Sequence, residues 1–145
     1  MSDAHDRPFV DTNVLLYLHD RTAGPKRERA LELLGGLVRS DVRLCLSVQV
    51  LQQFYVNATR KLGMQDAAAY AIVADLAAGD VHAPGPDDVL AAIDLHRRHR
   101  ISFWDSMIVR SASQLGCDVV WTEDLSHGRT YDGVVAHNPF VTPTA

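Results

Sequence analysis

The sequence has few of the features that mark secreted, membrane-bound or nucleotide-binding proteins. It holds two cysteines in 145 residues, Cys45 and Cys117, and neither forms a C-x-x-C pair, so both are predicted to be reduced thiols in the core. No apolar run approaches the ~18 residues that cross a bilayer, and the segment MSDAHDRP lacks the apolar stretch of a secretory signal. Walker A and G-x-G-x-x-G loops are absent. These absences favour a cytoplasmic protein without membrane contact or a nucleotide cofactor.

Positive charge is also scarce. Fourteen Lys and Arg stand against eighteen Asp and Glu, which gives a formal net charge of -4. Such a protein does not bind polyanions through its overall charge, so any contact with nucleic acid must be local or mediated by a metal ion. The hydrophobic content of 47% is sufficient for one core in a chain of this length. We therefore expect a single domain over residues 1–145.

Short apolar strands are expected to alternate with amphipathic helices along the chain. Strands are predicted at Phe9–Val10, Leu44–Leu46, Val81–His82, Val119–Thr122 and Val134–Ala136. Helices are predicted at Pro25–Val38, Ser47–Lys61, Asp66–Ala78, Asp87–Arg100 and Ser102–Leu115. This alternation predicts an α/β fold with a mostly parallel central sheet covered on both faces. Ligands of such sheets bind beyond the carboxyl ends of the strands, near a topological switch point.

Three aspartates stand where that crevice is expected. Asp11 directly follows the first strand, Asp124 follows the strand that ends at Thr122, and Asp105 lies in the first turn of a helix. Each one alone is explained equally well as an acid that caps a helix. Serine or threonine would serve as caps too, so aspartate at all three places favours a shared site. Clustered carboxylates raise one another's pKa unless a cation compensates, and oxygen ligands suit Mg²⁺ or Mn²⁺.

Four segments of the chain carry a resemblance to a known family. They are FVDTNVLLYL, SVQVLQQFYVNATRK, RISFWDSMIV and WTEDLSHGRTYDGVVAHNPF. In this order they resemble the PIN-domain family, in particular the VapC-like ribonuclease toxins of bacterial toxin–antitoxin pairs. The resemblance implies a three-layer α/β/α fold, an Mg²⁺- or Mn²⁺-dependent nuclease acting on RNA, and commonly a homodimer bound to an antitoxin. It places the family's catalytic, metal-binding acids on Asp11, Asp105 and Asp124, with Asn13 and Thr122 as polar neighbours.

The chain departs from the family pattern at Gln53, where the resemblance would place a glutamate. On a helix, Gln49, Gln53, Asn57 and Arg60 share one side, which is either a solvated face or the rim of the acidic crevice. An amide at this position removes one negative charge. Mg²⁺ needs only one or two carboxylates, so we expect weakened or single-metal binding rather than a dead site. Glu123 is a candidate for the missing charge, although successive strand residues point to opposite sides.

Substrate phosphates require local cations in an acidic protein. Arg60 and Lys61 end the helix that contains Gln53, and Arg100 precedes Asp105 by five residues, so these three are candidates for contacts to the RNA backbone. Cations at a helix C-terminus are explained at least as well by the helix dipole. The tryptophans, Trp104 and Trp121, are expected in the core rather than as platforms for stacked bases.

The helix expected over Asp66–Ala78 is apolar almost all round, with Tyr70, Ile72, Val73 and Leu76 among alanines. Such a helix requires cover on more than one side. A homodimer or a partner's helix would supply that cover, and burial within the chain explains the pattern equally well.

Three functions stay open at this level. The leading hypothesis is a metal-dependent endoribonuclease, the toxin of a toxin–antitoxin pair. A catalytically silent module that binds nucleic acid or a protein would carry Gln53 as a mark of decay, but it has no reason to keep three repelling aspartates. The third hypothesis is another class of acid-cluster phosphohydrolase. One such class usually has two aspartates separated by one residue after the first strand. This chain has Asp11-Thr12-Asn13 there, which counts against that class.

Overall fold

The computed structural model describes residues 7–141. The ends of the expected domain, residues 1–6 and 142–145, lie outside the described part. The strands are β1 (Phe9–Val10), β2 (Cys45–Ser47), β3 (Asp80–His82), β4 (Val119–Trp121), β5 (Thr130–Tyr131) and β6 (Val134–His137). The helices are α1 (Thr12–His19), α2 (Pro25–Arg39), α3 (Val48–Arg60), α4 (Asp66–Leu76), α5 (Pro86–His99) and α6 (Phe103–Gln114).

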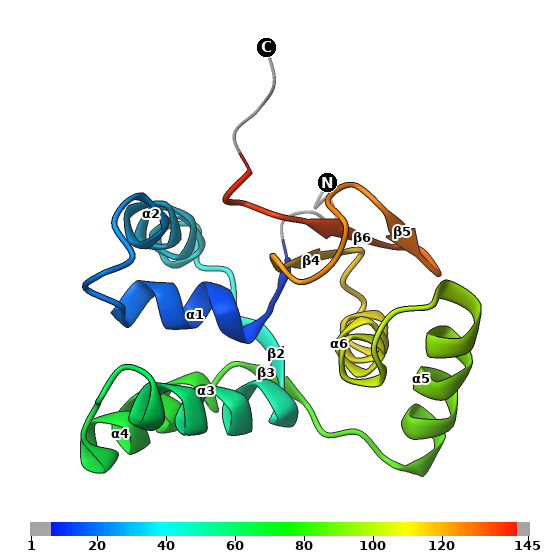
Figure 1. Cartoon of the computed structure of the whole chain (residues 1–145), viewed down its shortest axis with the longest axis horizontal. Coiled ribbons are helices and arrows are strands. Elements are labelled where there is room, and N and C mark those ends of the chain that lie inside the picture. The colour runs from blue at the N-terminus through cyan, green and yellow to red at the C-terminus, as the bar shows by residue number, and fades with distance from the viewer. Residues whose placement is uncertain (1–6, 142–145) are drawn as a thin grey trace.

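The strands form one sheet in the order β3-β2-β1-β4-β6-β5. All neighbouring strands are parallel except the β5–β6 hairpin. In Figure 1, α1 and α2 lie on one side of the strands, and α5 and α6 lie on the other. The α/β fold with a mostly parallel sheet between helices is therefore confirmed.

The sheet has its switch point at β1. From β1 the chain runs to β2 on one side, and it returns much later to β4 on the other side. Phe9 pairs with Cys45 of β2 and with Val120 of β4. The carboxyl ends of β1 and β4 are therefore adjacent, and residues that follow these two strands meet there although more than a hundred positions separate them.

The core is built from the strands and the inner faces of the helices. Phe9, Val10, Leu46 and Phe54 are fully buried. Both cysteines are buried free thiols. Helix α1 was not predicted, because LLYL after the cap is apolar without a clear period, and strand β5 was not predicted because it has only two residues.

Trp104 differs from expectation, and helix α4 bears on an alternative that the sequence left open. Trp104 is 61% exposed and contacts the ring of Phe103, so its assignment to the core was wrong: it occupies the second position of α6, where the helix end leaves the core. Helix α4 packs on α3 and buries only Ala69, while Tyr70 is 72% exposed. Burial within the chain thus covers only one side of α4.

None of the helices within residues 7–141 is both long and apolar enough to span a membrane.

Candidate active site

Asp11 lies at the centre of the candidate site, at the point where β1 ends and α1 begins. It is the N-cap of α1, and its Oδ1 accepts a hydrogen bond of 2.7 Å from the backbone N–H of Thr12. Its Oδ2 accepts one of 2.8 Å from the hydroxyl of Thr122, which follows β4. The residue is only 4% exposed. Burial raises the pKa of this carboxyl to about 6, against the lowering effect of both hydrogen bonds.

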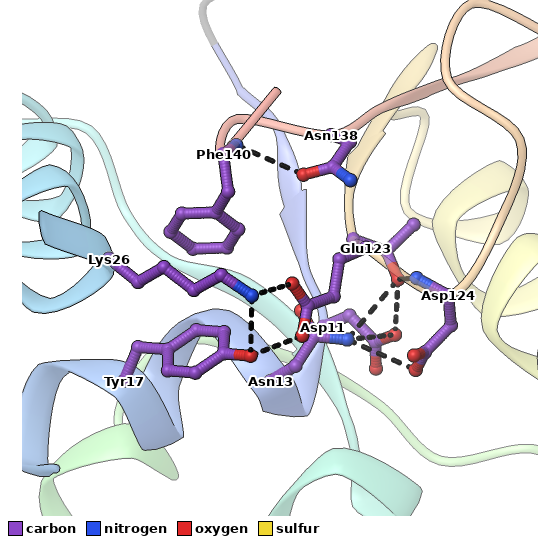
Figure 2. A network of polar contacts seen from close by, with 9 residues as sticks. Asp11, Asn13, Tyr17, Lys26, Glu123, Asp124, Asn138 and Phe140 are labelled. Carbon is purple, nitrogen blue, oxygen red and sulfur yellow. Dashed lines mark hydrogen bonds and ion pairs between the residues drawn. The ribbon is translucent and has the colours of Figure 1, made fainter. Parts of the chain in front are cut away.

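Asn13 links Asp11 to Asp124. Its Nδ2 donates to Oδ2 of Asp124 at 3.0 Å, and more weakly to Oδ2 of Asp11 at 3.5 Å and to Thr122 at 3.4 Å. The Thr122 hydroxyl in turn accepts the backbone N–H of Asp124 at 3.1 Å. Figure 2 shows this network joining the first turn of α1 to the loop after β4. The amide of Asn13 therefore holds the two carboxylates close together.

Asp105 lies in the first turn of α6, close enough to the other two aspartates for their charges to interact. Its backbone N–H donates to the Ser102 hydroxyl at 3.0 Å, so the expected cap of α6 by Ser102 is present. Burial raises the pKa of Asp105, and so does the charge of Asp124, while hydrogen bonding with Ser102 lowers it. The charges of Asp124 and Asp105 also contribute to the raised pKa of Asp11. Within residues 7–141, however, no three His, Cys, Asp or Glu side chains are grouped closely enough to hold one ion together.

The side of α3 that carries Gln49 and Gln53 lies against α1 and α6, the elements that carry Asp11 and Asp105. Gln53 Oε1 accepts a hydrogen bond of 3.0 Å from the Thr12 hydroxyl, beside Asp11. One turn earlier, Gln49 donates to the carbonyl of Trp104 at 3.2 Å, beside Asp105. Gln49 and Gln53 are half-buried, so this part of α3 contacts both α1 and α6, whereas Arg60 on the same side of the helix is exposed.

The sequence matches the PIN domain family over residues 9–133. The chain belongs to this family. Its fold is also similar to a chain of a toxin–antitoxin complex from Klebsiella pneumoniae, with 17% identity and a TM-score of 0.66 over 92% of this chain and 98% of that chain. None of the curated proteins compared with it matches.

PIN domain nucleases typically use a divalent metal ion, and the donors of this PIN domain fit one. Asp11 and Asp124 supply carboxylate oxygens, and Oδ1 of Asn13 is buried without a hydrogen-bond partner among the described residues. All three are hard oxygen donors. Mg²⁺ keeps several waters and is usually held by one or two carboxylates, so the chemistry of the site suits Mg²⁺ or Mn²⁺ without a third carboxylate in direct contact.

Glu123 faces away from the acidic network of this PIN domain. Its carboxylate accepts a hydrogen bond from the Tyr17 hydroxyl and forms an ion pair of 3.0 Å with Lys26 of α2. Lys26 lies 4.9 Å from the centroid of the Tyr17 ring, and Phe140 contacts that ring edge-on at 5.0 Å. Figure 2 shows the four side chains together beside Asn13. Tyr17 and Lys26 were not predicted near the site, because no local pattern links them to a residue about a hundred positions away.

The expected phosphate contacts lie at two separate places. Arg60 is the last residue of α3 and Lys61 caps its C-terminus. Both are exposed, and neither side chain has a partner within residues 7–141. Lys61 lines a cavity that also reaches Asn13. Arg100 ends α5 in a left-handed conformation with φ of 56° and is exposed, but it does not line that cavity.

Proposed function

We propose that this PIN domain is an endoribonuclease that hydrolyses RNA phosphodiesters with the help of Mg²⁺ or Mn²⁺. The observation that carries the proposal is the buried carboxylate of Asp11, which shares Asn13 and Thr122 with Asp124 at the switch point of the sheet. Folding an ionisable group into this position raises its pKa. A carboxylate that only caps a helix gains no stability from this burial. A carboxylate that binds a metal ion gains a stronger attraction for the ion.

In this proposal Asp11, Asp105 and Asp124 are the catalytic residues that bind the metal: Asp11 and Asp124 would hold the ion directly, and Asp105 would act on it through a bound water, because the three carboxylates are not grouped closely enough to hold one ion together. When bound, the ion would lower the pKa of a water molecule for attack on the phosphodiester and offset charge on the phosphate. Asp11 is fixed by two hydrogen bonds, and Asn13 sets its position relative to Asp124. Asp105 lies near them on another element, from which it would orient the attacking water. No side chain has to act as a covalent nucleophile.

We further propose that the protein is the cytoplasmic toxin of a toxin–antitoxin pair and that it forms a homodimer. The similarity of the fold to a chain of a toxin–antitoxin complex supports a protein antitoxin as partner. The exposed side of α4, with Tyr70, supports a surface that another chain covers.

A catalytically weakened module that binds nucleic acid or a protein is the second candidate. It is favoured by Gln53, whose amide occupies the position of an expected acid and is already engaged by the Thr12 hydroxyl. Against it stands the electrostatic cost of keeping Asp11, Asp105 and Asp124 together without a catalytic role.

The test is cleavage of a structured RNA pool by the purified protein with Mg²⁺, with Mn²⁺ and with EDTA. Asp11→Asn and Gln53→Glu are compared with the wild type, and Asp75→Asn, an exposed position on α4, is the matched control. Metal-dependent cutting that disappears in Asp11→Asn and persists in the control is expected. Absence of cutting by both the wild type and Gln53→Glu would leave the binding module as the better account.

A further inference from the structure

We propose that a cavity beside the acidic residues is a subsite for one unpaired nucleobase of the RNA, a proposal that rests on the function proposed above. The cavity has a volume of about 440 Å³, which falls in the range of small-molecule sites. It lies between α1, the loop that follows α1 and the C-terminal end of α3. Its lining residues are Asn13, Leu16, Tyr17, Asp20, Arg21, Thr22, Asn57, Lys61 and Leu62.

The cavity is continuous with the acidic network through Asn13. The same side chain lines the cavity and donates to both Asp11 and Asp124. A molecule in the cavity therefore lies one residue away from the carboxylates. In a bound strand this is the place of the nucleotide adjoining the phosphodiester that is cut.

The walls suit the flat face of a base. Leu16 and Leu62 contribute apolar surface, and Tyr17 contributes an aromatic ring. That ring is held by its hydrogen bond to Glu123, by Lys26 at 4.9 Å from its centroid and by the edge of Phe140. A fixed ring loses little entropy when a base stacks on it, and stacking of this kind tolerates any base.

The mouth of the cavity suits a phosphate backbone. Arg21 and Lys61 line it, both are exposed, and within residues 7–141 neither side chain makes an ion pair or hydrogen bond. Unpaired cations at one cavity stand out in a protein with a formal net charge of -4. They complement a phosphate on either side of the bound nucleotide, and for this reason we choose RNA over a peptide as the occupant.

The polar groups of the cavity favour a base with an amino group. Asn57 donates its Nδ2 to the carbonyl of Gln53 at 2.8 Å, which leaves its Oδ1 as an acceptor. Asp20, whose Oδ1 accepts from Thr22, adds carboxylate acceptors. Adenine, cytosine and guanine carry amino donors, whereas uracil does not. We therefore expect cytosine to bind better than uracil, which has almost the same shape.

The experiment measures binding of a fluorescent eight-nucleotide single-stranded RNA by anisotropy in EDTA, which prevents metal-dependent cutting. Each nucleotide in turn is replaced by an abasic ribose that keeps its phosphate. Removal of the base at one position is expected to weaken binding about fivefold or more, and cytosine is expected to exceed uracil there. Leu62→Trp fills the cavity and should abolish this dependence. Leu90→Trp, at a 65% exposed leucine of α5, is the matched control and should retain it.

A second pair of variants tests the mouth of the cavity. Lys61→Gln should reduce the dependence of affinity on salt by about one phosphate contact. Arg39→Gln removes a charge at the C-terminal end of α2, outside the cavity lining, and should not change that dependence. If Leu62→Trp fails to fold, as judged by circular dichroism, Thr22→Trp blocks the cavity from an exposed loop position.

The outcomes separate this proposal from the nuclease itself. Sensitivity to one abasic position that is lost in the blocked variants supports the subsite, even in a protein that cuts no RNA with Mg²⁺ or Mn²⁺. Equal affinity for all abasic strands, sensitivity that persists in the blocked variants, or no RNA binding overturns the subsite. If the wild type nevertheless cuts RNA, the nuclease stands and the cavity is left for a protein partner.

Discussion

Asp11→Asn should stabilise the fold while it abolishes cleavage. Burial and the neighbouring acids raise the pKa of Asp11 from its ordinary 3.8 to about 6. At about 1.4 kcal/mol per pKa unit, keeping this carboxyl ionised in the folded protein costs about 3 kcal/mol. Asparagine has nearly the same shape and no charge. It lacks one of the two acceptors that Thr12 and Thr122 use, which costs about 1 kcal/mol, so a net gain of about 2 kcal/mol is expected at pH 8.

The sign of this effect depends on pH. Because the pKa of Asp11 is higher in the folded than in the unfolded chain, its penalty is absent below pH 3.8 and grows between pH 3.8 and about 6. It is complete above that range. The stability of Asp11→Asn relative to the wild type should therefore increase across this interval as pH rises. Near pH 4 the variant should be no more stable than the wild type.

Urea unfolding without metal at pH 4 and pH 8 measures both effects. At pH 8 the difference of about 2 kcal/mol corresponds to a rise in Tm of about 4–8 °C for a chain of this size. Asp75→Asn, at an exposed position, should stay within about 0.5 kcal/mol of the wild type at both pH values. Added Mg²⁺ should then stabilise the wild type and not Asp11→Asn. A variant that is less stable than the wild type at pH 8, or a difference that is the same at both pH values, would show that burial of the Asp11 charge does not destabilise the fold.

Three other variants test the missing charge at Gln53, the ion pair of Asp88 with Arg110, and the ion pair of Lys26 with Glu123. Gln53→Glu keeps an acceptor for the Thr12 hydroxyl and adds a negative charge. Mg²⁺ should therefore raise the Tm of this variant more than that of the wild type. An equal rise would contradict a metal site weakened by Gln53. Asp88→Asn should destabilise the fold by about 2 kcal/mol at pH 7, because the Gly85 amide and Arg110 lower the pKa of Asp88 to about 2. This contribution is present above pH 3.8 and is lost as pH falls through 2, so urea unfolding should show a smaller difference at pH 2.5, and an undiminished one would exclude the mechanism. Lys26→Met removes a partly exposed ion pair and should cost less than about 1 kcal/mol, yet it should slow RNA cleavage measurably more than Lys26→Arg; equal rates would show that the ion pair does not support the site.

Much of the fold follows from the sequence alone. Alternating short apolar runs and amphipathic helices predict a mostly parallel sheet between helices, and the structure confirms it. The positions of Asp11 directly after β1 and of Asp124 in the loop that follows β4 are consistent with the same pattern. The elements that escaped prediction are those without a strong period, such as α1, or with only two residues, such as β5.

Tertiary structure decided which polar residues meet. A sequence pattern reports neighbours along one strand or helix, whereas Asn13 contacts Asp124 only because β1 and β4 are adjacent and parallel. The same holds for Lys26 with Glu123, and for the side of α3 that Gln53 presents to α1. The exposure of Trp104 was equally beyond a hydrophobicity argument, since the end of α6 leaves the core.

The class of fold and the acids near the ends of the strands therefore follow from the sequence, because they depend on local periodicity and residue type, whereas the missing charge at Gln53 is implied by the resemblance to the PIN-domain family. The pKa of Asp11, the direction of Glu123 and the cavity beside Asn13 were decided only when the chain packed. Burial and proximity in space set each of them, and neither quantity is a property of a linear pattern.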